Sequence, residues 1–298
     1  MKLNFICLIL LYLMCTGGVI FSQDAKNIFT YKVGDCEVNL LVENRGQRDS
    51  AIILADKSVV QKYIPEGTSP AQTNIFLVKT PKNTILIDTG FGTTLFENLK
   101  SLKIEPAKID IIFITHMHGD HISGLQKDGK PLFPNATVYL AEQEKNFWTD
   151  SKMMAAATEA RQNNFKLAQN ALAVYGKKVK TFKPADLNSK LKELVPRITP
   201  IAAFGHTPGH TLYLVSSGKE SLLITGDLIN VMEIQIPVPE IATVYDTDPK
   251  AASETRKKVF EYVTKNKIPI AGMHLLYPSI GTLEEPNKGE YKFNPAKH

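Results

Sequence analysis

The chain has 298 residues, of which 43% are hydrophobic and 22% are charged, and its formal net charge is +5. This length and apolar content suit one large domain or two small ones, and they exclude disordered and fibrous proteins. The lysines and arginines are interspersed with acidic residues along the chain. Because this charge is diffuse, we expect no nucleic-acid partner.

The first 23 residues have the pattern of a secretory signal peptide. Lys2 precedes an apolar run from Phe5 to Leu13, and a tail of mostly small and polar residues ends at Gln23. We expect cleavage near Gln23, which predicts a secreted or periplasmic protein with no membrane span in its mature form. An uncleaved membrane anchor is one alternative, although the apolar run is short for a span, and a lipoprotein processed at Cys15 is another.

After the signal, the alternation of apolar and polar residues predicts strands in two groups, each followed by helix. The first group of strands is expected over 27–42, 50–57, 74–79, 84–88, 109–115 and 137–140. The second group is expected over 178–182, 198–204, 211–216, 221–225 and 268–273. Helices are expected over 94–102, 142–175 and 251–266, and Asp150 is expected to cap a helix within the second of these. This order predicts two sheets packed together with helices outside.

Three of the seven histidines fall within six residues, in the run His116-Met117-His118-Gly119-Asp120-His121. The run begins where a buried strand is expected to end, so alternate residues of the run, such as His116 and His118, can face one side. Imidazole and carboxylate ligands suit zinc, and four such groups exceed the protein ligands of one catalytic zinc. Two metals are therefore expected. The alternative is a solvated loop or a structural site, but structural zinc normally uses cysteine and this run has none.

Three later motifs place further ligand-type side chains next to strands. His206 and His210 lie in the loop Gly205-His206-Thr207-Pro208-Gly209-His210, whose glycines and proline fix its shape. Asp227 follows the strand expected over 221–225, and His274 follows the last predicted core strand. Taken singly, each of these residues could equally be an ordinary polar residue at a strand end.

In this order, the motifs resemble those of the metallo-β-lactamase-fold hydrolases, over residues 74–274. The resemblance implies an α+β fold, an αββα sandwich of two packed mixed β-sheets. It also implies a single hydrolase domain over 24–298 with a helical insertion at about 142–176. Asp88 matches an early aspartate of the family, which would bind the second ring nitrogen of a ligand histidine.

The same resemblance implies a centre with two Zn²⁺ per chain, with other divalent metals left open. His116, His118 and His210 would bind one metal, and Asp120, His121 and His274 the other. Asp227 would bridge the two metals. His206 matches a position that we interpret as loop structure or as a support for a ligand.

The secreted form, the long insertion and the ending Gly272–Gly281 resemble the branch of N-acyl homoserine lactone lactonases and methyl parathion hydrolase. We expect a quorum-quenching lactonase whose metal-bridging hydroxide opens the ring of a small-molecule acyl lactone while Asp120 moves the proton. A phosphotriesterase of the methyl parathion hydrolase type, another secreted ester hydrolase, and a metal-binding protein without turnover are the alternatives. The oligomeric state is open, with a homodimer as one option.

Two features of the substrate site are open. Small lactonases of this fold carry a tyrosine where this chain has Asn230, so Asn230, a tyrosine from elsewhere or the metal alone would polarise the carbonyl. The helical insertion begins with apolar side chains that would shape an acyl pocket, or that simply pack the helix on the core. These are Phe147, Trp148, Met153 and Met154.

Overall fold

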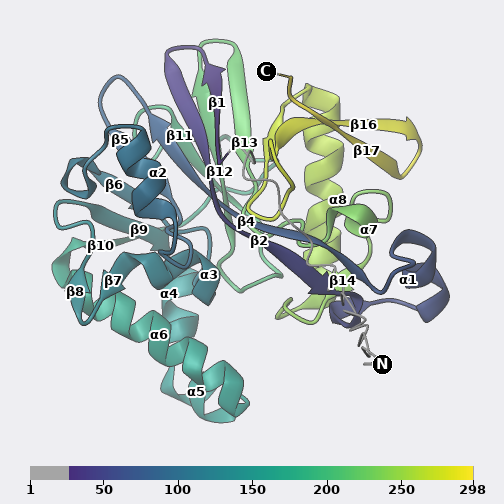
Figure 1. Ribbon diagram of the computed structural model, residues 1–298, viewed down its shortest axis with the longest axis horizontal. Coiled ribbons are helices and arrows are strands. Elements are labelled where there is room, and N and C mark those ends of the chain that lie inside the picture. The colour runs from purple at the N-terminus through teal and green to yellow at the C-terminus, as the bar shows by residue number, and fades with distance from the viewer. Residues whose placement is uncertain (1–26, 298) are drawn as a thin grey trace, which may run out of the picture.

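A computed structural model describes residues 27–297, in which two β-sheets pack face to face with helices on their outer sides (Figure 1). One sheet has seven strands in the order β1-β2-β4-β5-β6-β9-β10, and the other has six in the order β11-β12-β13-β15-β16-β17. Both are mixed: β5, β6, β9 and β10 pair in parallel in the first sheet and β13 pairs with β15 in parallel in the second, whereas the remaining neighbours are antiparallel. The predicted αββα sandwich is therefore confirmed.

The seven-stranded sheet consists of β1 (Ile28–Val33), β2 (Cys36–Asp49), β4 (Thr68–Lys79), β5 (Thr84–Ile87), β6 (Ile111–Phe113), β9 (Thr137–Ala141) and β10 (Val179–Phe182). The six-stranded sheet consists of β11 (Ile198–Ala202), β12 (Thr211–Ser217), β13 (Glu220–Ile224), β15 (Ile270–Ala271), β16 (Ile280–Asn287) and β17 (Glu290–Pro295). Two small ribbons pair β3 (Ile53–Leu54) with β14 (Ala242–Thr243) and β7 (Gln126–Lys127) with β8 (Lys130–Pro131).

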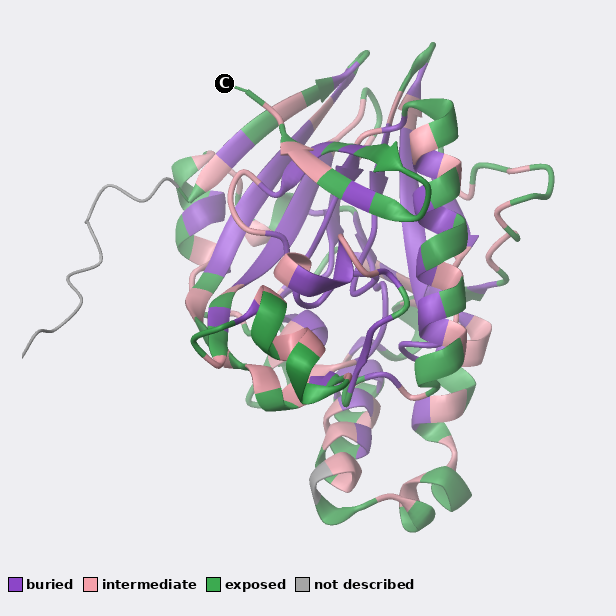
Figure 2. Ribbon diagram, turned by 90° about the vertical axis from the view of Figure 1, so that its right-hand side faces the viewer, coloured by how far each residue is buried: buried purple, intermediate pink, exposed green. Residues whose placement is uncertain are grey.

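The α-helices are α1 (Lys57–Tyr63), α2 (Leu95–Ser101), α3 (Gly119–Ile122), α4 (Glu142–Thr149), α5 (Ser151–Ala156), α6 (Glu159–Tyr175), α7 (Met232–Gln235) and α8 (Pro249–Asn266). In Figure 1, α2, α4 and α6 lie on the side of the seven-stranded sheet and α8 lies on the side of the other sheet. The tip of the hairpin formed by α5 and α6 extends away from the sheets and is largely exposed (Figure 2). None of the helices in residues 27–297 is long and apolar enough to cross a membrane.

The core follows from the alternation of side chains along buried strands. In β4, Phe76 and Val78 belong to the cluster between the two sheets, whereas Ile75 and Leu77 belong to the cluster beneath α2, α4 and α6. All four side chains are fully buried, because the sheet is covered on both faces. Such a strand therefore has apolar residues at successive positions. The helix α8 buries Phe260 and its neighbours in a third cluster against the six-stranded sheet.

Most predicted elements are found at their expected positions, but several differ. The strand expected over 178–182 is β10, which pairs with β9 in the seven-stranded sheet and does not belong to the second group. The strand predicted over 50–57 is found only at Ile53–Leu54 (β3): the Asp49 side chain accepts a hydrogen bond from Ala51 N at 2.8 Å and starts a 3₁₀ turn before it, and α1 begins at Lys57 after it. The helical stretch over 142–175 forms three helices, and the predicted cap is confirmed because Asp150 accepts from Lys152 N and Met153 N. Strands β16 and β17 were not expected. The predicted signal peptide lies outside the described residues and stays a prediction.

Candidate metal centre

A buried carboxylate at the end of β5 fixes the start of the histidine-rich run. Asp88 has a left-handed backbone, with φ 61°, and is 1% exposed. Its Oδ1 accepts from Thr115 N at 2.8 Å, and its Oδ2 accepts from Thr115 Oγ1 at 2.7 Å. Since Thr115 N is bound to this side chain, strand β6 ends before it, and the chain turns so that His116 is buried beside Asp88.

The first ligand group combines three imidazole nitrogens with one carboxylate oxygen. His206 Nε2 lies 3.2 Å from His116 Nε2, 3.0 Å from His118 Nδ1 and 3.3 Å from Asp227 Oδ2. His116 Nε2 lies 3.0 Å from His118 Nδ1 and 3.7 Å from Asp227 Oδ2. A tetrahedral zinc ion with bonds of about 2.0–2.1 Å separates its ligand atoms by roughly 3.3 Å. The spacing of these four atoms therefore fits one such ion.

The second ligand group shares Asp227 and lies beside the first. His274 Nε2 is 3.1 Å from Asp227 Oδ2 and 3.4 Å from Asp120 Oδ2. His121 Nε2 is 3.0 Å from Asp227 Oδ1 and 3.7 Å from Asp120 Oδ2. Because Oδ2 of Asp227 also lies 3.3 Å from His206 Nε2 of the first group while Oδ1 faces His121 of the second, its carboxylate can bridge two ions.

Buried polar atoms in this cluster show that a cation fits it. His121 Nε2 and Asp227 Oδ1 are fully buried, and apart from their 3.0 Å contact with each other they have no hydrogen-bond partner among the described residues. Burial lowers the pKa of His118 to about 3, so this ring is neutral and can bind a metal. Burial also acts to lower the pKa of His206, but its bonds to Asp227 and Asp246 outweigh burial and raise the pKa to about 9. A divalent ion would displace the proton that His206 otherwise carries.

The second ring nitrogen of each of four ligand histidines has its own acceptor or hydroxyl partner, the arrangement that fixes the orientation of metal ligands. These pairs are His116 Nδ1 with Thr115 Oγ1 at 3.0 Å, His121 Nδ1 with Asp88 Oδ2 at 2.6 Å, His206 Nδ1 with Asp246 Oδ1 at 2.8 Å and His274 Nδ1 with Gln72 O at 2.8 Å. Asp88 thus has the role that the resemblance implies. Sequence analysis did not find Asp246, because no motif marks it.

The structure corrects one predicted ligand: His206, and not His210, lies in the metal centre. Both ring nitrogens of His210 are occupied elsewhere. Nδ1 is bound to Ala203 O at 3.0 Å, and Nε2 accepts from Asp227 N at 3.0 Å. His210 therefore supports the backbone of Asp227 and has no nitrogen left for an ion. The other six predicted ligands are brought together as two groups.

Replacing Asp88 by asparagine tests how the second group is oriented. Asn keeps the size of the side chain but removes the charge that faces His121 Nδ1 at 2.6 Å. We expect the affinity for the ion bound by Asp120, His121 and His274 to fall by about 10–100-fold. Titration of the metal-free protein with zinc measures this change, and an unaltered second binding step would contradict the role of Asp88.

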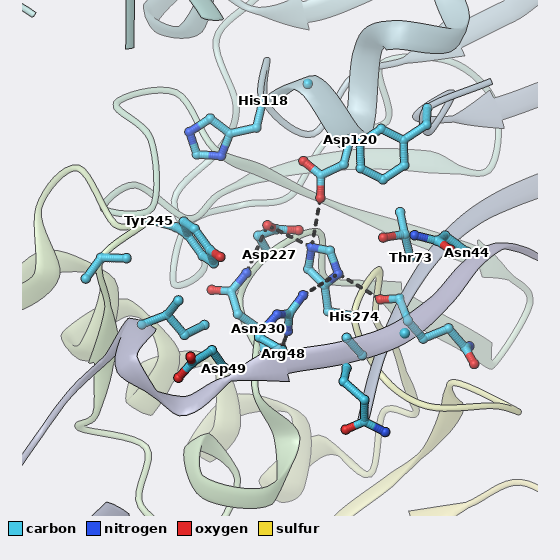
Figure 3. Close-up of a pocket in the computed structure, with 18 of the residues that line it drawn as sticks. Asn44, Arg48, Asp49, Thr73, His118, Asp120, Asp227, Asn230, Tyr245 and His274 are labelled. Carbon is cyan, nitrogen blue, oxygen red and sulfur yellow. Dashed lines mark hydrogen bonds and ion pairs between the residues drawn. The ribbon is translucent and has the colours of Figure 1, made fainter. Parts of the chain in front are cut away.

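A cavity of about 720 Å³ opens onto the metal centre (Figure 3). His118, Asp120, Asp227 and His274 line it, and Asp120, Asp227 and His274 point toward one another at its centre. Its apolar lining includes exposed side chains at the rim, namely Phe91, Val244 and Tyr245.

The apolar side chains that begin the helical insertion do not line this cavity. Phe147 and Trp148 pack on Phe165, with ring centroids 5.2 Å and 4.8 Å from it. Met154 packs against the same core cluster and Met153 is exposed. The packing alternative therefore describes Phe147, Trp148 and Met154, and the insertion contributes Arg161 and Asn164 of α6 to the cavity instead.

Asn230 lines the cavity but its amide faces the bridging carboxylate. Its Nδ2 donates to Asp227 Oδ2 at 2.9 Å, and its backbone N donates to Gln235 Oε1 at 2.7 Å. Arg48, which the sequence did not mark, donates to the carbonyl of Asn230 and also lines the cavity. In this arrangement Asn230 supports Asp227, and its donation to a substrate stays a prediction.

A family model described as the metallo-β-lactamase superfamily matches residues 68–267, which is more than half of the chain. The chain belongs to this superfamily. It is a metal-dependent hydrolase of the metallo-β-lactamase fold with two His/Asp ligand groups, consistent with a dinuclear centre. The matched range contains every member of both groups except His274.

Two solved structures of this superfamily are similar over almost the entire chain. The hydrolase AbOPH is 31% identical with a TM-score of 0.84, and the match covers 93% of this chain and 99% of AbOPH. AidC, a dizinc quorum-quenching lactonase solved with the product N-hexanoyl-L-homoserine, is 26% identical with a TM-score of 0.81. That match covers 91% of this chain and 98% of AidC.

Curated relatives of the superfamily match shorter regions. Exodeoxyribonuclease WalJ of Streptococcus pneumoniae is 28% identical over 126 residues, which is 41% of this chain and 41% of WalJ. This chain thus spans less than half the length of that relative, and the shared region supports the fold and the centre rather than nuclease activity.

Proposed function

We propose that this hydrolase opens the lactone ring of N-acyl homoserine lactones, with zinc as its metal. The observation that carries the proposal is a dinuclear ligand cluster at the base of an open cavity whose rim is apolar. A polar ring that reacts at the metals and an apolar acyl tail would each find a matching surface there. The similarity to AidC along 91% of the chain supports the same substrate class.

The reaction divides between the metals and the side chains of the cavity. Bound divalent ions would act as Lewis acids on the carbonyl oxygen and lower the pKa of water so that it can attack at neutral pH. Asp120, whose side chain is 26% exposed at the cavity, can accept a proton on Oδ1, the oxygen not assigned to a metal, and pass it to the departing ring oxygen. Asn230 orients the bridging Asp227 through its amide.

The acyl chain would lie against Phe91, Val244 and Tyr245, which are 44%, 51% and 42% exposed. Burying such side chains under an alkyl chain is favourable by about 25 cal/mol per Å² of apolar surface removed from water. Tyr245 is also the tyrosine that lines the cavity, and in Figure 3 it lies across the cluster from Asn44 and Thr73. Its phenol is thus the candidate for the tyrosine from elsewhere that would polarise the carbonyl.

The test compares two substrate classes on the purified, zinc-loaded chain. We expect N-hexanoyl homoserine lactone to be opened, as followed by the release of acid, and a paraoxon-type phosphotriester to be turned over far more slowly. A chelator should abolish ring opening and added zinc should restore it. Protein with two zinc ions per chain that hydrolyses the phosphotriester but not the lactone would show that the alternative substrate is correct. If the protein binds zinc but hydrolyses neither the lactone nor the phosphotriester, the alternative of a metal-binding protein without turnover would be correct.

A further inference from the structure

The first helix of the insertion, α4, carries a buried carboxylate that contacts both loops of the first ligand group. Glu144 is fully buried. Its Oε1 accepts from Met117 N at 2.8 Å and from Trp148 Nε1 at 2.7 Å. Its Oε2 accepts from Thr207 Oγ1 at 2.7 Å and from Gly209 N at 2.8 Å. All four partners are donors, which is the environment that stabilises a carboxylate away from water.

Two of these donors, Met117 and Thr207, lie next to metal ligands along the chain. Met117 lies between His116 and His118, and Thr207 directly follows His206. The three histidines next to these donors are the three nitrogen ligands of the first group. Glu144 therefore joins the loop after β6 to the loop before β12. These two loops are about 90 residues apart along the chain, and they meet where His206 Nε2 lies 3.2 Å from His116 Nε2.

Two further contacts tie α4 to the same ligand group. A Cβ at Gly209 would collide with the backbone of Glu144, so a glycine is needed for the loop to approach the helix this closely. Trp148, one turn after Glu144, contacts the ring of His118 edge-on, with centroids 5.7 Å apart. The same tryptophan donates to Glu144. The helix thus contacts this group through a carboxylate, a ring and its backbone.

The second group is supported from other parts of the fold. His121 is bound to Asp88 after β5, and His274 is bound to the carbonyl of Gln72 in β4. Neither contact involves α4. Asp88 also binds Thr115, the partner of His116 Nδ1, but Glu144 contacts neither support of the second group, so Glu144 can be changed without removing one of them.

We infer that Glu144 is a positioning residue for one metal site of the pair, the site formed by His116, His118 and His206, and that it leaves the other site unaffected. This inference rests on the dinuclear centre and not on the identity of the substrate. Its readout is metal affinity, so the absence of lactone turnover would count against the proposed function alone.

The variant Glu144→Gln tests the inference in the full chain. The glutamine amide keeps the size of the side chain. Its NH₂ group, however, would face two of the donors from which the wild-type carboxylate accepts hydrogen bonds. We expect zinc titration of the metal-free protein to show one of two binding steps weakened by about 10–100-fold and the other unchanged. A purely structural role would weaken both steps alike.

Combining Glu144→Gln with a second substitution, in two separate double variants, identifies which site is affected. In His274→Ala, where the second group is incomplete, Glu144→Gln should weaken the remaining site by the same factor. In His206→Ala, where the first group is incomplete, it should cause no further loss. Additional loss in His206→Ala, equal weakening of both steps, or unchanged affinities in a folded variant would each overturn the inference.

A matched control is available in Glu43, another buried carboxylate, which is 2% exposed. It accepts from Thr93 Oγ1 at 2.9 Å and Thr94 N at 3.3 Å near the start of α2, and it belongs to neither ligand group. Glu43→Gln should leave both zinc steps unchanged. If Glu144→Gln does not fold, Thr207→Val removes one of the four donors without changing the charge, and it should weaken the same single step to a smaller extent.

Discussion

Replacing Asp227 by alanine is expected to lower kcat/KM by at least about a thousandfold, which corresponds to roughly 4 kcal/mol of transition-state stabilisation. Asp227 is the one residue that belongs to both ligand groups. Its Oδ1 faces His121 of the second group at 3.0 Å and its Oδ2 faces His206 of the first group at 3.3 Å. Without this carboxylate, two cations would lie close together with only Asp120 left to offset their charge, so at most one should remain bound.

The measurement is zinc content per chain after dialysis, together with turnover of the substrate that the wild-type protein hydrolyses. Asp227→Asn is the matched variant, because the amide keeps the shape but cannot neutralise two ions, and we expect it to resemble Asp227→Ala. Circular dichroism of both variants controls for folding. Two zinc ions per chain and undiminished turnover in Asp227→Ala would refute the bridging role.

The parts of the centre that could be predicted from sequence are those whose information is local. His116 to His121 follow a short buried strand, and Asp227 and His274 each come soon after another. Apolar runs mark such strands, and the residue types at their ends indicate the chemistry. Strand ends in packed sheets converge, so ligands far apart in sequence could be expected to meet.

Other parts depend on contacts that a single sequence does not reveal. Asp246 binds His206 from 40 residues away, and Glu144 accepts from a loop 65 residues further along the chain. In the sequence, both residues have ordinary polar neighbours and belong to no recognisable motif. The strand predicted over 50–57 is shortened to Ile53–Leu54 for a related reason, since one Asp49 side-chain bond to Ala51 N starts a 3₁₀ turn in place of its first residues.

The exchange of His206 for His210 as a ligand has a specific structural cause. Both histidines lie in one tight loop, and spacing alone does not show which ring faces the metals. Gly226 decides it: its backbone is left-handed, with φ 53°, and a Cβ there would collide with His210 Nε2. That close approach lets His210 Nε2 accept from Asp227 N, so this ring supports the bridging residue and His206 is left for the centre.

The pair His206→Ala and His210→Ala is therefore expected to separate metal binding from stability. His206→Ala removes the nitrogen that lies within 3.3 Å of three other ligand atoms, so at saturating zinc we expect one ion per chain in place of two. Activity should fall by at least about a hundredfold, since roughly 2.7 kcal/mol of transition-state stabilisation is a modest share of what a metal ion supplies.

His210→Ala removes no ligand, but it leaves Asp227 N and the Ala203 carbonyl without their partner in a buried site. An unsatisfied buried group costs about 1–3 kcal/mol, so the free energy of unfolding of the metal-free protein should fall by at least that amount, whereas two zinc ions still bind at saturation. Zinc content and urea unfolding of both variants provide the comparison. The opposite result, with zinc lost from His210→Ala and retained in His206→Ala, would restore the ligand set that the family resemblance implied, because the two rings cannot both supply the third nitrogen of one tetrahedral site.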